Sequence, residues 1–282
     1  MTAILLTILL ILVLYLFAIG SRRRSKKRFA PLMGWDYAHR GLHDNRGENG
    51  QPPVRPENSM AAFRAAVEAG YGIELDVQLT RDGQMVVFHD DTLPRVCGVS
   101  GRVDAHSYEE LLAFPLLGSA ERIPLFADVL SMVDGRVPLI VELKMSPVNN
   151  YPVCEAASKI LRDYHGDYCM ESFSPLAVKW FRRYRPGVIR GQLSSRLTPL
   201  AKTGKEKLSY FAVTHLLTNC LCRPDFIAYD HTAAKGNLSL WLCRHLFGTV
   251  PVAWTIRSQE DYDRARSRFD LMIFEGFRPA EK

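Results

Sequence analysis

Short apolar runs that favour β-strands alternate with helical patterns over most of this 282-residue chain. Such alternation is typical of parallel β/α units. The predicted strands are 37–40, 72–79, 85–88, 138–143, 168–173, 188–193, 225–229, 250–256 and 271–274. Helical patterns cover 59–69, 107–113, 126–133, 154–164, 175–184 and 259–268. We therefore expect an α/β fold, a (β/α)8 TIM barrel with one extra hairpin strand, rather than an open doubly wound sheet.

An apolar run at residues 4–20 precedes this alternating region and ends at a basic cluster. At about 1.5 Å per helical residue, the run and its flanks approach the ~30 Å thickness of the hydrocarbon core of a bilayer. A cleaved signal peptide begins with a basic segment, and no Lys or Arg precedes this run, so we expect an uncleaved transmembrane anchor. The basic residues are Arg22, Arg23, Arg24, Lys26, Lys27 and Arg28.

The position of the basic cluster predicts a topology. Positively charged flanks stay in the cytoplasm, so we expect a single-pass membrane protein whose main domain is cytoplasmic. The predicted segments are an anchor at 1–21, a basic juxtamembrane segment at 22–30 and a barrel domain at 31–282. The cluster either sets topology alone or also attracts anionic headgroups. It supplies much of the net charge of +6, so we expect no nucleic-acid partner.

Three acidic residues stand in or at the end of otherwise apolar strand patterns. Glu74 and Asp76 are two residues apart, so on a strand their side chains share one face. Adjacent acids are electrostatically costly unless a cation neutralises them. Glu142 ends another apolar run, and Lys144 shares its face. Because carboxylate oxygens are hard ligands, the three acids predict a divalent cation site for Mg²⁺, Ca²⁺ or Mn²⁺.

Two histidines and two cations lie at the ends of predicted strands as well. His39 and His89 could transfer protons, while Arg40 and Lys144 could contact an anion. Together with the acids, this set indicates phosphodiester chemistry, in which one His deprotonates the nucleophile and the other protonates the leaving alkoxide. Any one of these residues alone is as well explained by a salt bridge at the barrel rim.

A polar loop before the first barrel helix adds supporting residues. Either Asn58 or Ser59 is expected to cap the helix that follows. Glu57 is expected either to orient Arg40 or to approach the metal.

The ordered motifs closely resemble the glycerophosphodiester phosphodiesterase family, over roughly residues 35–278. The motifs are His39-Arg40-Gly41, Pro56-Glu57-Asn58-Ser59, Glu74-Leu75-Asp76-Val77, Asp82-Gly83, Val86-Val87-Phe88-His89-Asp90 and Glu142-Leu143-Lys144. The resemblance implies a TIM barrel with a short insertion at about 91–124. It also implies a phosphoric diester hydrolase that uses a divalent metal to release sn-glycerol 3-phosphate and an alcohol from glycerophosphodiesters.

The resemblance also implies residue roles. Glu74, Asp76 and Glu142 match metal ligands, and His39 and His89 match the general base and acid. Arg40 and Lys144 match phosphate-binding groups, and Trp254 matches an aromatic residue near the glycerol. The attacking group implied is the glycerol 2-hydroxyl, although spacing alone does not distinguish it from water. One departure is that Glu275 stands where the last strand of the family usually runs into an Asp.

Two alternatives to hydrolysis of soluble glycerophosphodiesters stay open. A lysophospholipase D-type enzyme would act on lysolipids at the membrane, and an apolar groove beside the site, lined by 211–221, would favour it. A non-catalytic protein that binds headgroups is the other alternative. Segment 197–222 is expected to be a core helix, with a membrane-facing amphipathic helix as the competing interpretation. The oligomeric state has no signal in the sequence.

Overall fold

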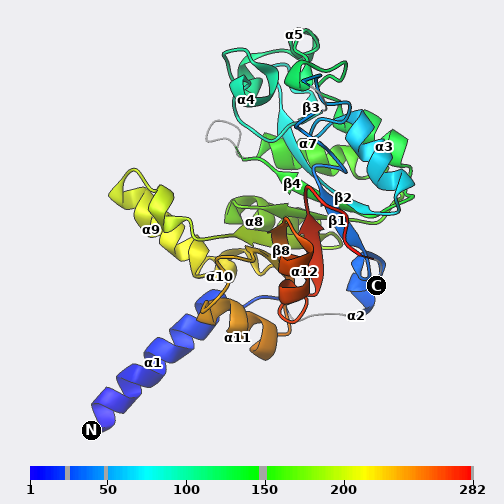
Figure 1. The fold of residues 1–282 in the computed structure, drawn as a ribbon. Helices are drawn as coiled ribbons and strands as arrows, with labels where there is room; N and C mark the ends of the chain where they lie inside the picture. The colour runs from blue at the N-terminus through cyan, green and yellow to red at the C-terminus, as the bar shows by residue number, and fades with distance from the viewer. Residues whose placement is uncertain (23–25, 48–49, 146–150, 281–282) are drawn as a thin grey trace.

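The computed structural model describes residues 1–22, 26–47, 50–145 and 151–280, and its centre is a closed barrel of eight parallel strands (Figure 1). The strands are β1 (Asp36–His39), β2 (Gly72–Leu79), β4 (Leu139–Leu143), β5 (Tyr168–Ser172), β6 (Ile189–Ser194), β7 (Phe226–Asp230), β8 (Val250–Ile256) and β9 (Leu271–Phe274). Pairing of β1 with both β2 and β9 closes the barrel. Strand β3 (Met85–Val87) pairs antiparallel with β2. The predicted (β/α)8 barrel with one hairpin strand is confirmed.

Helices cover the outside of the barrel between successive strands (Figure 1). They are α3 (Met60–Glu68), α6 (Phe126–Val133), α7 (Pro152–Ile160), α8 (Pro175–Tyr184), α11 (Leu238–Leu246) and α12 (Gln259–Ala265). The outward faces of the strands and the apolar helix faces form one large core cluster. A second cluster fills the barrel interior, with Ile140, Phe226 and Val252 among its members. Phe29 and Leu32, from α2 (Lys26–Phe29) and η1 (Ala30–Leu32), join this inner cluster.

The expected insertion forms a separate lobe with its own apolar core. It contains α4 (Pro94–Cys97), η2 (Val103–Ala105), α5 (Tyr108–Leu111) and η3 (Leu116–Gly118). Phe88, Leu93, Val96 and Ile123 are buried together there. In Figure 1 the lobe lies above the barrel, at the end of the β2–β3 hairpin. Because β3 runs back along β2, the hairpin returns the chain to the barrel, where the main-chain N–H of Phe88 donates to the carbonyl of Asp76 and His89 follows.

Helix α1 (Thr2–Ile19) extends away from the barrel, and the side chains of residues 2–14 are exposed (Figure 1). It has the length and apolar composition of a membrane span, criteria that a signal sequence also meets. Its last turn packs between α10 (Asn219–Cys222) and α11, where Ile19 is fully buried. Arg23 and Arg24 of the basic cluster lie outside the described residues. The division into three segments stays a prediction.

The expectation of a core helix over 197–222 is wrong for most of that segment. The segment breaks into η4 (Thr198–Leu200), α9 (Gly204–Thr214) and α10. Only Val213 and Thr214 of α9 are buried, whereas Leu208 is 71% exposed. Apolar and charged residues are distributed around α9 without one apolar face, so the helix has no stripe to bury.

Candidate active site

The three predicted metal ligands lie together inside the carboxyl ends of β2 and β4. The strands are in register with Asp76 beside Glu142, and β1 places His39 beside Glu74. Carboxylate oxygens of Glu74, Asp76 and Glu142 all lie within 4.8 Å of one another, and the three side chains are buried. The alternation of faces along β2 therefore brings its two acids to the same point as Glu142.

Lys144 lies against two of these acids. Its Nζ is 2.8 Å from Oδ1 of Asp76 and 2.6 Å from Oε1 of Glu142. Burial lowers the pKa of Lys144, but the charges of both acids outweigh it and hold the pKa above its usual value. Lys144 is thus a charged ammonium that neutralises part of the acidic cluster.

Arg40 binds the cluster from the other side, at a tight turn after β1. Its main-chain N–H donates to Glu74, its Nη1 lies 2.7 Å from Glu57, and its Nε lies 3.4 Å from Asp76. Arg40 has φ of 55°, and Gly41, which follows, has φ of 80°. A Cβ on Gly41 would lie 2.9 Å from the main chain of Ala62, so this turn requires glycine.

Glu57 and Asn58 lie behind the metal-ligand candidates. The Asn58 amide donates to Oδ2 of Asp76 at 2.8 Å, whereas Ser59 is the residue that caps α3. Glu57 accepts from both Arg40 and Arg95 and does not belong to the carboxylate cluster. Of the two expectations for Glu57, the structure therefore supports an orienting contact to Arg40.

His89 is held by its neighbour Asp90. Its Nδ1 lies 2.6 Å from Oδ1 of Asp90, and Arg95 donates to the same carboxylate. Burial by itself raises the pKa of Asp90, but the bonds from His89 and Arg95 hold it well below its usual value. Because an ionised carboxylate only accepts, Nδ1 of His89 carries a proton.

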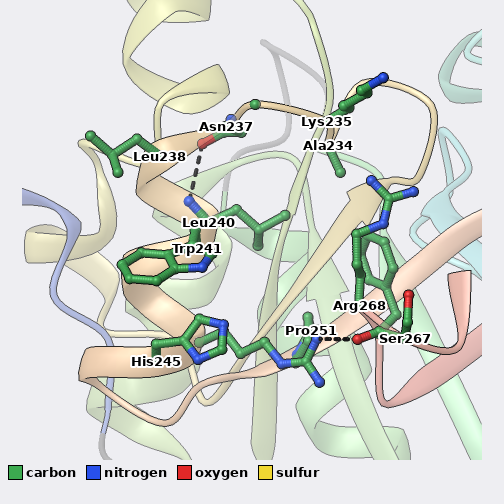
Figure 2. Close-up of a pocket in the computed structure, with 13 residues that line it drawn as sticks. Ala234, Lys235, Asn237, Leu238, Leu240, Trp241, His245, Pro251, Ser267 and Arg268 are labelled. Atoms are coloured by element: carbon green, nitrogen blue, oxygen red, sulfur yellow. Dashed lines mark hydrogen bonds between the residues drawn. The ribbon is translucent and has the colours of Figure 1, made fainter.

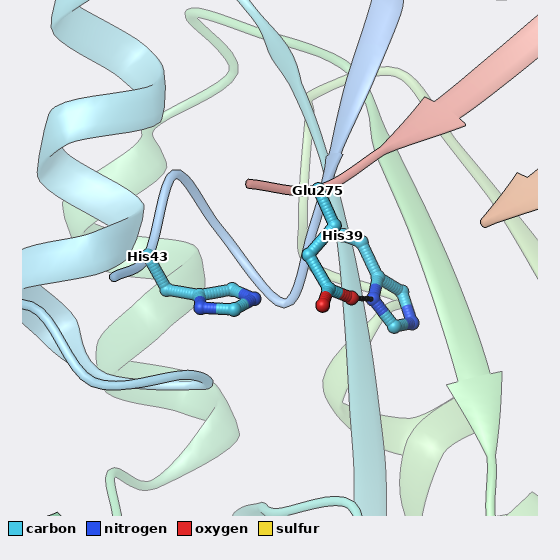
Figure 3. Close-up of side chains that lie close together, drawn as sticks. All are labelled: His39, His43 and Glu275. Carbon is cyan, nitrogen blue, oxygen red and sulfur yellow. Dashed lines mark hydrogen bonds and ion pairs between the residues drawn. The ribbon is translucent and has the colours of Figure 1, made fainter. Parts of the chain in front are cut away.

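His39 has the same arrangement with a residue that follows β9. Figure 3 shows Glu275 between His39 and His43, bonded to His39. Nδ1 of His39 is 2.6 Å from Oε2 of Glu275, and its Nε2 is 3.9 Å from Oε2 of Glu74. Burial lowers the pKa of His39 to about 4, against the opposing effect of Glu275. His39 is therefore neutral at pH 7, with its proton on Nδ1 and a lone pair on Nε2.

Both histidines line one cavity of about 130 Å³ at the barrel mouth, together with Arg40, Glu74, Glu142 and Trp254. A hollow of about 610 Å³ on the side of β4 and β5 also reaches His89 and Glu142. Trp254 meets Phe173 edge to face with ring centroids 5.6 Å apart. Within the described part of the chain, its Nε1 is buried without a hydrogen-bond partner.

The predicted apolar groove is not part of this site. None of the described residues 211–221 lines either hollow. Phe211 and Leu221 are instead about half exposed elsewhere on the surface. The apolar groove that would favour lysolipids is therefore absent from the described cavity.

The sequence does not predict the full role of three residues of the site. Glu171, in β5, pairs in register with Glu142 and lines the same cavity as the histidines. Arg95, in α4, joins Glu57 to Asp90. In the sequence, Glu275 is only a departure from the family pattern, and its bond to His39 is not predicted. An acid in an otherwise apolar strand pattern was the available signal for Glu171.

The acids have the donor set and electrostatics of a divalent cation site. Burial and the neighbouring charges of Asp76, Glu142 and Glu171 raise the pKa of Glu74 well above its usual range. Burial and the neighbouring charge of Glu142 also raise the pKa of Glu171 well above its usual range. The positive charges of Lys144 and Arg40 therefore do not fully neutralise the carboxylates of the cluster. A divalent ion held by hard oxygen ligands fits this deficit.

Comparisons with known proteins identify one family. The sequence model of the glycerophosphoryl diester phosphodiesterase family matches residues 39–268. The mouse protein named lysophospholipase D GDPD1 is 33% identical over 289 aligned residues, which cover 88% of this chain and 83% of that protein. A glycerophosphodiester phosphodiesterase of Bacillus altitudinis is 37% identical over 131 residues. That match covers 44% of this chain and 50% of the Bacillus protein, so the chain spans half the length of that relative.

Solved structures agree with the fold. An Oleispira antarctica phosphodiesterase, determined in complex with the product sn-glycerol-3-phosphate, superposes with a TM-score of 0.69 at 20% identity. The match covers 88% of this chain and 94% of that one. At this identity the likeness establishes the barrel architecture.

Proposed function

Since the chain belongs to the glycerophosphoryl diester phosphodiesterase family, we propose that it is a phosphoric diester hydrolase that cleaves glycerophosphodiesters into sn-glycerol 3-phosphate and an alcohol. The observation that carries the proposal is the single cavity lined by His39 and His89 beside buried carboxylates. Two proton-transfer groups and an acidic cation site around one cavity suit phosphodiester cleavage.

In the proposed mechanism, Glu74, Asp76 and Glu142 hold a divalent cation, either Mg²⁺, Ca²⁺ or Mn²⁺. The ion supplies charge that binds and polarises the phosphodiester. His39 accepts the proton of the glycerol 2-hydroxyl at Nε2 as the hydroxyl oxygen bonds to phosphorus. The bond from phosphorus to the alcohol breaks, and a proton from His89 completes the leaving alcohol. Water then opens the cyclic phosphate.

Other residues hold the substrate and the histidines in this proposal. Arg40 and Lys144 contact the phosphate oxygens, and the glycerol packs against Trp254, whose indole N–H is available to a hydroxyl. Glu275 keeps the proton of His39 on Nδ1, and Asp90 does the same for His89. Glu57 and Asn58 fix Arg40 and Asp76.

Helix α1 is proposed to anchor the enzyme in a membrane, with the barrel in the cytoplasm. Its length and composition and the basic residues that follow support this topology. A membrane location, together with the mouse relative named lysophospholipase D, favours a second candidate activity, the hydrolysis of lysolipids. The position of phosphodiester cleavage is the same for both substrates.

A substrate panel tests the proposal. The full chain in detergent is assayed with soluble glycerophosphodiesters and with lysophospholipids, each with Mg²⁺, Ca²⁺ or Mn²⁺ and with chelator. Metal-dependent release of an alcohol from either class is expected, and the faster class identifies the substrate. Absence of metal-dependent hydrolysis on every substrate would instead support a protein that only binds headgroups.

A further inference from the structure

The end of α1 is fixed rigidly to the body of the protein. The Tyr15 hydroxyl lies 2.8 Å from that of Ser239 in α11. The carbonyl of Ile19 accepts from Asn219 in α10 at 3.0 Å and from the thiol of Cys243 in α11. Residues 15–19 therefore have no freedom to leave α10 and α11 without breaking buried contacts.

This packing of α1 against α10 and α11 limits the distance between the barrel and the membrane surface. Residues 2–14, the part of α1 that is exposed, span only about 20 Å at 1.5 Å per residue. The hydrocarbon core of a bilayer is about 30 Å thick, so the docked turn is needed to complete a span. If α1 crosses a membrane as proposed above, the groups packed around Ile19 lie at the bilayer surface.

Helix α11 presents an amphipathic surface at this level. Leu238, Trp241 and Leu246 are each between 57% and 59% exposed. The ring of Trp241 packs against that of His245 at an interplanar angle of 39°, with ring centroids 4.8 Å apart. An exposed Trp among leucines is typical of side chains at the boundary between headgroups and acyl chains.

Beside Trp241 is a pocket of about 540 Å³ between α11 and the turn from α12 to β9. Figure 2 shows Trp241 and His245 on one side of this pocket and Lys235 and Arg268 on the other. The side chains of Lys235 and Arg268 are exposed and form no hydrogen bond or ion pair within the described residues. Arg244 pairs with Asp270 and forms part of the wall.

We infer that this pocket and the exposed face of α11 are a second membrane contact, which binds an anionic phospholipid next to the anchor. The phosphate lies between Lys235 and Arg268, and acyl chains lie along Leu238 and Trp241. The charge of the two free cations complements an anionic headgroup, and the apolar rim complements its acyl chains. The inference rests on the proposed membrane anchoring but not on the proposed hydrolysis.

Fluorescence quenching by brominated lipids tests this contact. The full chain is reconstituted in vesicles of phosphatidylcholine with a fixed fraction of either brominated phosphatidylcholine or brominated phosphatidylglycerol. Trp241 is expected to provide most of the emission that brominated lipid quenches. Trp241→Phe should therefore remove most of the quenching, whereas the matched control Trp180→Phe should retain it. Equal quenching in wild type and Trp241→Phe would overturn the contact.

The headgroup preference is measured in the same vesicles. Brominated phosphatidylglycerol is expected to quench at least twofold more than brominated phosphatidylcholine at equal content. Lys235→Gln with Arg268→Gln abolishes this preference, whereas Lys159→Gln with Arg162→Gln, the same charge change on and just after α7, preserves it. Equal quenching by the two lipids in wild type would contradict a site for an anionic lipid.

Extraction with alkaline carbonate separates the two proposals. Protein that is extracted from the vesicles lacks a spanning anchor, which overturns both the anchor and this contact. Protein that stays in the membrane with an unquenched Trp241 retains the anchor and overturns the contact alone.

Discussion

Oε2 of Glu275, which directly follows the last barrel strand, lies 2.6 Å from Nδ1 of His39, which ends the first. The two strands are neighbours where the barrel closes, so residues 236 positions apart meet at one hydrogen bond. Burial raises the pKa of Glu275, but the bond from His39 outweighs it and lowers the pKa to about 2. The ionised carboxylate therefore fixes the tautomer of His39 at neutral pH.

Replacing Glu275 with Gln is expected to lower kcat by roughly 10²-fold with little change in KM, because an amide can donate to Nδ1 and favour the wrong tautomer of the general base. Steady-state kinetics with the preferred substrate from the panel measure this split. Glu275→Asp retains the charge and is expected to recover part of the rate. Glu260→Gln, at an exposed carboxylate, serves as the matched control, and a rate loss as large in that variant would contradict the account.

Glu74→Gln is expected to stabilise the metal-free protein and to abolish its response to metal. The raised pKa of Glu74 reflects burial and repulsion from Asp76, Glu142 and Glu171, which the neutral amide relieves. In wild type a bound cation stabilises by mass action, so Tm rises with Mg²⁺, Ca²⁺ or Mn²⁺. Thermal unfolding in detergent with chelator and with each metal measures both effects. A metal-induced rise in Tm that persists in Glu74→Gln would place the ion elsewhere.

Lys144→Met is expected to have the opposite effect on the metal-free protein. Removal of the ammonium leaves Asp76 and Glu142 without their close cation, and breaking such a buried pair costs about 3–5 kcal/mol. A divalent cation should recover much of this loss, since it neutralises the same oxygens. Chemical unfolding with and without metal checks the prediction, which unchanged stability in chelator would refute.

Glu57 is expected to make stability depend on pH in the acidic range. Burial raises its pKa, but hydrogen bonds and charges from Arg95 and Arg40 lower it to about 2, against an ordinary value of 4.5. Because the pKa is lowered in the folded protein, ionised Glu57 stabilises the fold above pH 4.5, by roughly 3 kcal/mol in total. This stabilisation is lost as the pH falls toward 2. The difference in unfolding free energy between wild type and Glu57→Gln should be roughly 1 kcal/mol smaller at pH 3.5 than at pH 7. A constant difference would mean that Glu57 has no such shift.

The barrel was predictable because each strand is a short apolar run bounded by turns, and parallel strands buried on both faces produce that pattern. The carboxylates of β2 and β4 were predictable for the same reason, since an acid in an apolar strand needs a partner. Glu171 shows the same signal in 168–173, and the predicted barrel, in which consecutive strands are neighbours, places β5 beside β4. Its membership of the site follows from strand order in the closed barrel.

Other features depended on contacts across the fold. The bond between Glu275 and His39 exists because β9 returns to β1, which local sequence does not encode. Helix α11 was missed because 238–246 contains an apolar run that obscures its helical period, although Asn237 provides a cap that could have indicated it. The exposure of α9 has a signal in the sequence, because residues 204–214 have no continuous apolar face that a helix could bury.

Release of sn-glycerol 3-phosphate tests the central claim most directly. The full chain is incubated with a glycerophosphodiester and divalent metal, and the product is measured by an enzyme-coupled assay. We expect release that stops with chelator, falls by at least roughly 10²-fold in His39→Asn, and is unchanged in His165→Asn, an exposed histidine outside the site. Release at the wild-type rate by His39→Asn, or in the presence of chelator, would contradict the assignment of the active site.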